Sequence, residues 1–154
     1  MASQYRYKGA CLCGAVQVRL TSTPLLTLAC HCDGCQKFSA GAFTLTAMFP
    51  KQNFSCSGAV EIGGLRSEGR AHFFCAACKV FVYSELSGAP DRVNVRTSIL
   101  ENGASLEPFV EVMTDEKLPW VYVPAVHSFS KFPKSVDVLH ALMDEYSKHQ
   151  SVTE

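Results

Sequence analysis

The stretch Ala29-Cys30-His31-Cys32-Asp33-Gly34-Cys35 places three thiols within six residues. Residues two apart in an extended strand share a face, so Cys30 and Cys32 present their sulfur atoms on the same side. Asp33-Gly34 is a turn pair that can fold Cys35 back beside them. The stretch therefore predicts three converging metal ligands, while His31 is expected on the opposite face and outside the same metal site.

The balanced charge predicts binding at a local site, and the lack of a secretory signal or long apolar run predicts a cytoplasmic protein. Fourteen basic and 14 acidic residues cancel, so no overall field favours nucleic acid or an anionic membrane. Met1 to Lys8 has no apolar core of a secretory signal, and no later window approaches an 18-residue apolar run. We expect no nucleic-acid partner and no membrane partner. The oligomeric state stays open.

The chain has eight cysteines, and a reducing compartment favours metal ligation over disulfides for clustered thiols. If the chain were exported, four disulfides would be the rival. Neighbours such as Cys11 and Cys13 point the same way on a strand and pair poorly with each other, which favours metal.

The pair Cys75-Ala76-Ala77-Cys78 has the spacing of half a closed zinc site on a tight turn between two strands. A redox dithiol is the competing interpretation. Thioredoxin-like pairs open a helix, and no helical pattern follows Cys78.

Seven cysteines divide into a complete set and an incomplete set. Cys11, Cys13, Cys75 and Cys78 make four ligands, as in a structural zinc site, whereas Cys30, Cys32 and Cys35 leave one position open, as in a catalytic zinc site. We therefore expect two zinc ions per chain. In another partition, the first pair would join Cys30 and Cys32. Cys56 has no thiol neighbour in sequence and is predicted to be a bystander.

Alternating apolar residues predict a mainly β fold of antiparallel sheets around the zinc sites. From Ser135 the apolar spacing becomes helical. We expect a zinc-binding β domain at residues 1–134 and one amphipathic C-terminal helix at 135–150, packed on that domain or on a partner. A polar loop is predicted at 63–69, and strands are predicted at 5–10, 15–20, 25–32, 43–49, 92–97 and 109–113.

Three motifs, taken in order, resemble the glutathione-dependent formaldehyde-activating enzyme family, which includes centromere protein V. They are Gly9-x-Cys11-x-Cys13-Gly14-x-Val16, Cys30-His31-Cys32-x-x-Cys35 and Phe74-Cys75-x-x-Cys78. The resemblance runs from about Tyr7 to Pro133. It implies a β-tent-like fold and the same division into a structural and a catalytic zinc. It also implies a carbon-sulfur lyase of the S-hydroxymethylglutathione synthase type, acting on glutathione and formaldehyde.

One departure from the family pattern concerns the third motif. Ala76 and Lys79 stand where the family commonly has glycines, so this turn must form without the freedom of glycine at positive φ.

The open zinc site is expected to join a small thiol to formaldehyde or a related aldehyde, with the thiol as the fourth zinc ligand or with the carbonyl polarised by zinc. Arg66 and Arg70 are the candidates for binding the substrate carboxylates. His72 is a weaker candidate for a role in the site. The alternatives are a zinc-stabilised binding module without catalysis and a thiol redox protein.

Overall fold

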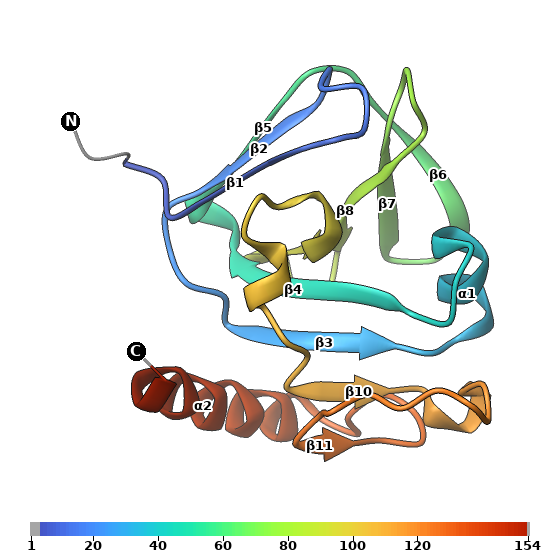
Figure 1. Ribbon diagram of the computed structural model, residues 1–154, viewed down its shortest axis with the longest axis vertical. Coiled ribbons are helices and arrows are strands. Elements are labelled where there is room, and N and C mark those ends of the chain that lie inside the picture. The colour runs from blue at the N-terminus through green and yellow to red at the C-terminus, as the bar shows by residue number, and fades with distance from the viewer. Residues whose placement is uncertain (1–3, 154) are drawn as a thin grey trace. The chain divides into compact units, whose positions relative to one another are not determined.

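The computed structural model describes residues 4–153, except for the side chains of 65–67 and 152–153. Within this range eleven strands, two α-helices and four short 3-10 turns confirm the mainly β prediction. The chain forms two compact units, the first from residues 1–24 and 47–106 and the second from residues 25–46 and 107–154. Figure 1 labels both helices and most of the strands, and each unit is described below by itself.

The first unit is built from antiparallel strands. One sheet has the order β1 (Tyr7–Ala10), β2 (Gln17–Leu20), β5 (Phe54–Ser57). A second run of hydrogen-bonded neighbours consists of β6 (Val60–Ser67), β7 (Arg70–Cys75), β8 (Phe81–Leu86) and β9 (Arg92–Arg96). Three 3-10 turns are η1 (Lys51–Asn53), η2 (Thr97–Ile99) and η3 (Gly103–Ser105).

The alternation that predicts the strands also fills the core of the first unit. In β2, Val18 and Leu20 are buried while Gln17 and Arg19 are exposed. The rings of Phe73 and Tyr83 stack with centroids 4.5 Å apart across the β7–β8 pair. Such cross-strand aromatic pairs add to the stabilisation from burial alone. The remaining core side chains include Val16, Phe49, Val82, Val93 and Val95.

The loop predicted at 63–69 is wrong, because β6 extends to Ser67 and pairs with β7. The register shifts between Gly63 and Ser67, so the glycines that look like loop signals sit at an irregularity within a strand. The turn itself is confined to Glu68 and Gly69.

The second unit places β3 (Leu26–Cys30) parallel to β10 (Val110–Val112), which pairs in parallel with β11 (His127–Ser128). The strand β4 (Thr44–Pro50) carries the chain from this unit into the first. A 3-10 turn, η4 (Thr114–Glu116), follows β10. The strand β3 ends at Cys30, two residues earlier than the predicted end at residue 32.

Two helices belong to the second unit, α1 (Asp33–Ser39) and α2 (Val136–Thr153). The Ser135 hydroxyl accepts a hydrogen bond from the Val138 amide at 3.3 Å and caps α2, where the change of period predicts a helix start. Tyr146 of α2 packs on Phe109 with ring centroids 5.3 Å apart. Neither described helix is long and apolar enough to cross a lipid bilayer.

Gly58 allows a close backbone approach that any larger residue would prevent. It has φ +97°, and an added Cβ would lie 2.1 Å from the carbonyl oxygen of Ala15. We predict that Gly58→Ala lowers the free energy of unfolding by about 2 kcal/mol or more, through overpacking and backbone strain. Denaturant titration measures this change.

Gly88→Ala is the matched control, because nothing lies within 4 Å of its added Cβ. Its effect on the free energy of unfolding should stay within about 0.5 kcal/mol. Equal effects of the two substitutions would contradict the role assigned to Gly58.

Candidate metal centres

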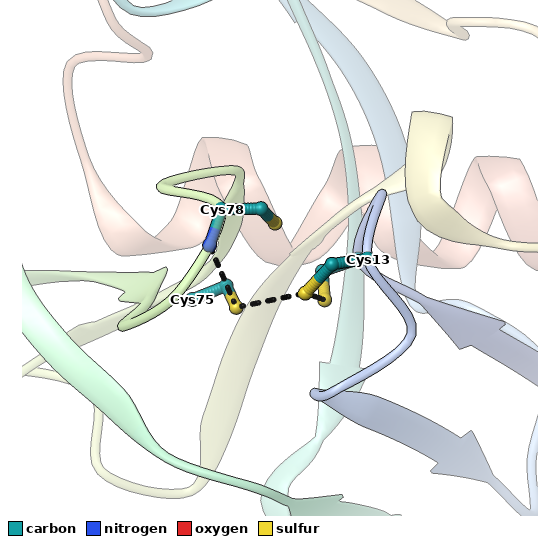
Figure 2. A group of neighbouring side chains, drawn as sticks. Cys13, Cys75 and Cys78 are labelled. Atoms are coloured by element: carbon teal, nitrogen blue, oxygen red, sulfur yellow. Dashed lines mark hydrogen bonds between the residues drawn. The ribbon is translucent and has the colours of Figure 1, made fainter.

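Four thiols of the first unit converge from two turns. Cys11 and Cys13 lie in the turn between β1 and β2, while Cys75 and Cys78 lie at the turn between β7 and β8. All four sulfur atoms lie within 4.8 Å of one another. Figure 2 shows Cys13 facing Cys75 across this gap, with their sulfur atoms 3.8 Å apart.

These distances fit a zinc ion. Zinc–sulfur bonds of about 2.3 Å in a tetrahedron separate the sulfur atoms by roughly 3.8 Å. The separation of the Cys13 and Cys75 sulfur atoms has this value, and the Cys11 and Cys13 sulfur atoms lie 3.5 Å apart. Four thiolates would complete the coordination shell of zinc, as in a structural site.

Backbone amides point at the sulfur atoms of this group. The Val16 amide donates to Cys11 Sγ at 3.2 Å, and the Cys78 amide donates to Cys75 Sγ at 3.5 Å. Hydrogen bonds from backbone amides, that of Val80 first, lower the pKa of Cys78 to about 6. These hydrogen bonds favour the thiolate form of Cys78, which a metal ion requires. At Cys13 a hydrogen bond with the Ala15 backbone is outweighed by the neighbouring thiols, Cys11 first, which raise the pKa of Cys13 to about 11.

In the turn between β7 and β8, the two residues that replace the glycines of the family pattern differ in backbone conformation. Lys79 adopts φ +63°, in the left-handed region, whereas Ala76 is not among the residues with positive φ. The Lys79 amide donates to the Cys75 carbonyl at 2.9 Å, and its ammonium group pairs with Glu61. Of the two substituted positions in this turn, only Lys79 therefore carries backbone strain.

The second group consists of Cys30, Cys32 and Cys35, whose sulfur atoms also lie within 4.8 Å of one another. The predicted turn at Asp33-Gly34 is wrong, because these residues begin the helix α1. Cys32 is the N-cap, and its sulfur accepts a hydrogen bond from the Cys35 amide at 3.3 Å. One turn of helix returns Cys35 to the side of Cys32, as the predicted turn would have done.

Two thiols of this group, those of Cys30 and Cys32, favour protonation when no metal is bound. The hydrogen bond with Cys35 and then burial raise the pKa of Cys30, and burial raises that of Cys32. Metal binding would therefore release protons from these sulfur atoms. No His, Asp or Glu from the described part of the chain joins either group of thiols.

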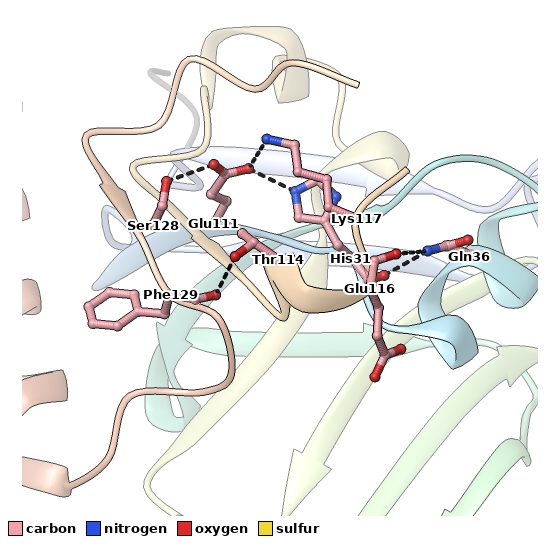
Figure 3. Close-up of polar contacts among 8 residues, drawn as sticks. All are labelled: His31, Gln36, Glu111, Thr114, Glu116, Lys117, Ser128 and Phe129. Carbon is pink, nitrogen blue, oxygen red and sulfur yellow. Dashed lines mark hydrogen bonds and ion pairs between the residues drawn. The ribbon is translucent and has the colours of Figure 1, made fainter. Parts of the chain in front are cut away.

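His31 is fully buried and turns away to Glu111, as its alternating position indicates. The ionised Glu111 carboxylate only accepts hydrogen bonds, so His31 Nε2 carries the proton of their 2.9 Å contact. Glu111 also accepts from Lys117 Nζ at 2.9 Å and from Ser128 Oγ at 2.6 Å (Figure 3). We call these four residues the Glu111 network.

The buried carboxylate stays ionised because of its partners. Burial alone would raise the pKa of Glu111, but hydrogen bonds from Ser128, Lys117 and His31 outweigh burial and hold the pKa below its ordinary value. Sequence reasoning missed this group. Between the two valines of β10, a glutamate is expected to face solvent, and no local pattern marks it as buried.

The other candidate residues are distributed as follows. Cys56, on β5, is half-buried and belongs to neither group, and all eight cysteines are free thiols. Arg70, on β7, lines a cavity of about 390 Å³ together with Arg92, whereas the Arg66 side chain lies outside the described residues.

His72 is buried, and its Nδ1 lies 2.8 Å from Ser84 Oγ. Burial, with the charges of Arg96 and Arg70, lowers the pKa of His72 to about 4. His72 is therefore neutral at physiological pH.

The fold and the two thiol groups define a mainly β protein with candidate thiolate metal centres. The sequence profile of the glutathione-dependent formaldehyde-activating enzyme family matches residues 6–116, which include every cysteine. The chain belongs to this family, and the resemblance drawn from the three motifs is confirmed. That resemblance extends to Pro133, beyond the matched region.

One solved structure supports the fold. The crystal structure of a Rhodobacter sphaeroides protein has 21% sequence identity and a TM-score of 0.50, and it covers 61% of this chain and 87% of its own chain. At this identity the likeness concerns the fold only. No curated protein sequence gives a significant match.

The strain at Lys79 leads to a stability prediction. A left-handed conformation costs an L-residue about 1–2 kcal/mol, and a β-branched residue tolerates it worst. Lys79→Val should therefore lower the free energy of unfolding by about 2 kcal/mol. Lys79→Gly should change it by less than about 1 kcal/mol, because strain relief and chain entropy oppose each other. Thermal and denaturant unfolding of the zinc-loaded protein measure both changes.

Lys79→Gln controls for the lost pair with Glu61, since an exposed ion pair contributes less than about 1 kcal/mol. If Lys79→Val were as stable as Lys79→Gln, backbone conformation would not limit this turn.

Proposed function

We propose that the chain is a zinc-dependent carbon-sulfur lyase that adds a glutathione-like thiol to formaldehyde or a related aldehyde. Cys30, Cys32 and Cys35 would hold the catalytic zinc, and Cys11, Cys13, Cys75 and Cys78 would hold a structural zinc. Family membership supports the reaction class, and the two thiol groups support the division of roles.

The difference between the two groups carries this proposal. Four sulfur atoms satisfy a tetrahedral ion, whereas three leave one position for a substrate. The described residues offer the second group no fourth ligand from a Cys, His, Asp or Glu side chain. A catalytic zinc site needs such an opening.

A zinc ion in the three-cysteine group would bind the substrate thiol or polarise the aldehyde carbonyl. In the overall addition, the sulfur forms a bond to the carbonyl carbon, the C=O π bond breaks and the thiol proton passes to the oxygen. The product is a hemithioacetal, which for formaldehyde is the S-hydroxymethyl derivative of the thiol. Every cysteine of the second unit belongs to this group. Three sulfur ligands suit a soft metal ion that can also bind a substrate thiol.

Arg66 and Arg70 are proposed to bind carboxylates of the thiol substrate. Support for Arg70 comes from the cavity that it lines together with Arg92, whose volume of about 390 Å³ suits part of a small ligand. Glu85 is the one acidic side chain among the described residues of that lining, and it pairs with Lys51, so its charge is compensated. Guanidinium groups bind carboxylates in bidentate geometry.

Metal content tests the division into two sites. We expect two zinc ions per chain in the wild-type protein, one in a folded Cys32→Ser variant, and loss of the structural ion with much of the stability in Cys75→Ser. Elemental analysis with circular dichroism measures both properties.

Cys56→Ser is the matched control and should keep both ions, because Cys56 lies outside both groups. A wild-type protein with one zinc ion, or a Cys32→Ser variant that unfolds, would contradict the open catalytic site.

Exchange NMR tests the reaction. The zinc-loaded protein should accelerate exchange between glutathione and its formaldehyde adduct above the uncatalysed rate, and Cys32→Ser should abolish the acceleration. Wild-type protein that binds two zinc ions but gives no acceleration would point instead to another thiol substrate or to a zinc-stabilised binding module.

A further inference from the structure

We propose that Glu111 is a positioning residue of the three-cysteine site, acting through His31 on the backbone that carries Cys30 and Cys32. The inference rests on the proposed function insofar as that site holds a metal ion. Glu111 would act indirectly, because the Glu111 network would hold the metal ligands in place and would make no contact with substrate.

The connection is short. His31 is the residue between two of the three ligands, so the orientation of its ring is coupled to the backbone torsions on both sides. Its Nε2 donates to Glu111 at 2.9 Å, and its amide donates to the Val112 carbonyl at 3.1 Å. The parallel register pairs Val112 with Cys30, so β10 supports this corner of the site through its backbone as well as through Glu111.

Burial makes the Glu111 network sensitive to the loss of one member. His31 is 0% exposed and Glu111 is 5% exposed. Both carboxylate oxygens are used, since Oε1 accepts from Ser128 and Oε2 accepts from His31 and Lys117. These hydrogen bonds hold the Glu111 end of the network in place, and the loss of a partner would loosen it. His31 Nδ1, on the other side of the ring, has no hydrogen-bond partner among the described residues.

A second set of hydrogen bonds holds the other end of the same segment. Gln36 Nε2 donates to the His31 carbonyl at 2.8 Å and to the Glu116 carbonyl at 2.9 Å (Figure 3). The Asp33 amide, at the start of α1, donates to Glu116 Oε2 at 2.5 Å. Residues 111–128 thus hold the cysteine-bearing segment from the end of β3 to the first turn of α1.

Part of this support lies outside the region matched by the family profile. The match ends at Glu116, whereas Lys117 and Ser128 lie beyond it. Family membership does not supply these two partners of Glu111. The Glu111 network thus combines two residues inside the matched region, His31 and Glu111, with two residues beyond it.

The test is the zinc affinity of each site in the full-length, zinc-loaded chain, measured by competition with a chromogenic chelator. Partners that orient metal ligands typically change affinity by about 10–100-fold when removed. We expect Glu111→Gln to weaken zinc at the three-cysteine site by about tenfold or more, with the four-cysteine site unchanged. The thiolate-to-cobalt absorption of the cobalt-loaded three-cysteine site should shift in the same variant.

Glu145→Gln is the matched control, because Glu145 also pairs with a histidine, His127, at 2.8 Å, but at an exposed position. It should leave both affinities and the cobalt spectrum as in wild type. Ser128→Ala removes one hydrogen bond from Glu111 Oε1 and keeps every charge, so it should give a smaller loss at the same site. It also keeps the test decisive if Glu111→Gln fails to fold.

The outcomes separate two failures. If wild type binds zinc at both sites and the Glu111→Gln and Ser128→Ala variants match Glu145→Gln, the positioning role is overturned while the proposed function stands. Lower thermal stability without a change in zinc affinity also overturns it, because the network would then be structural only. If wild type binds no zinc at the three cysteines, the proposed function itself fails.

Discussion

The close approach of Gly58 to the backbone of Ala15 is the constraint on which the four-thiol group depends. On one side of Gly58, β5 pairs with β2 through Ser57 and Gln17, next to the turn that carries Cys11 and Cys13. On the other side, β6 pairs with β7 through Val60 and Cys75. A short segment thus joins the two strand pairs that present the four sulfur atoms, and only a residue without a side chain fits at its centre.

The second unit brings its thiols together differently. The thiols of Cys30, Cys32 and Cys35 are neighbours in sequence, so little chain must be ordered to bring them together. What the fold must supply is support that keeps them in one arrangement. Parallel pairing of β3 with β10 and the Glu111 network supply that support from residues about 80 positions away. A site gathered from distant turns suits a role in stability, whereas a compact local cluster can keep a position open for a ligand.

Much of the fold was predictable from local pattern. Alternation marks β2 and β9, and a change of period together with a capping serine marks the start of α2. The failures have physical causes. The glycines of β6 resemble a loop, yet pairing with β7 supplies the hydrogen bonds that keep this segment extended. The helix α1 has seven residues, fewer than two full turns, which is too short to show a helical period.

The sequence by itself determined the two groups of thiols, because metal-ligand spacing is a local property of the chain, and it determined the family through the same motifs. Only the tertiary structure decided that Glu111 is buried and bonded to His31, Lys117 and Ser128. It also decided that Lys79 takes the left-handed conformation. Burial and backbone strain depend on which strands and turns surround a residue. A glutamate between two valines has no local signature of burial, and a lysine after a cysteine has no local signature of backbone strain.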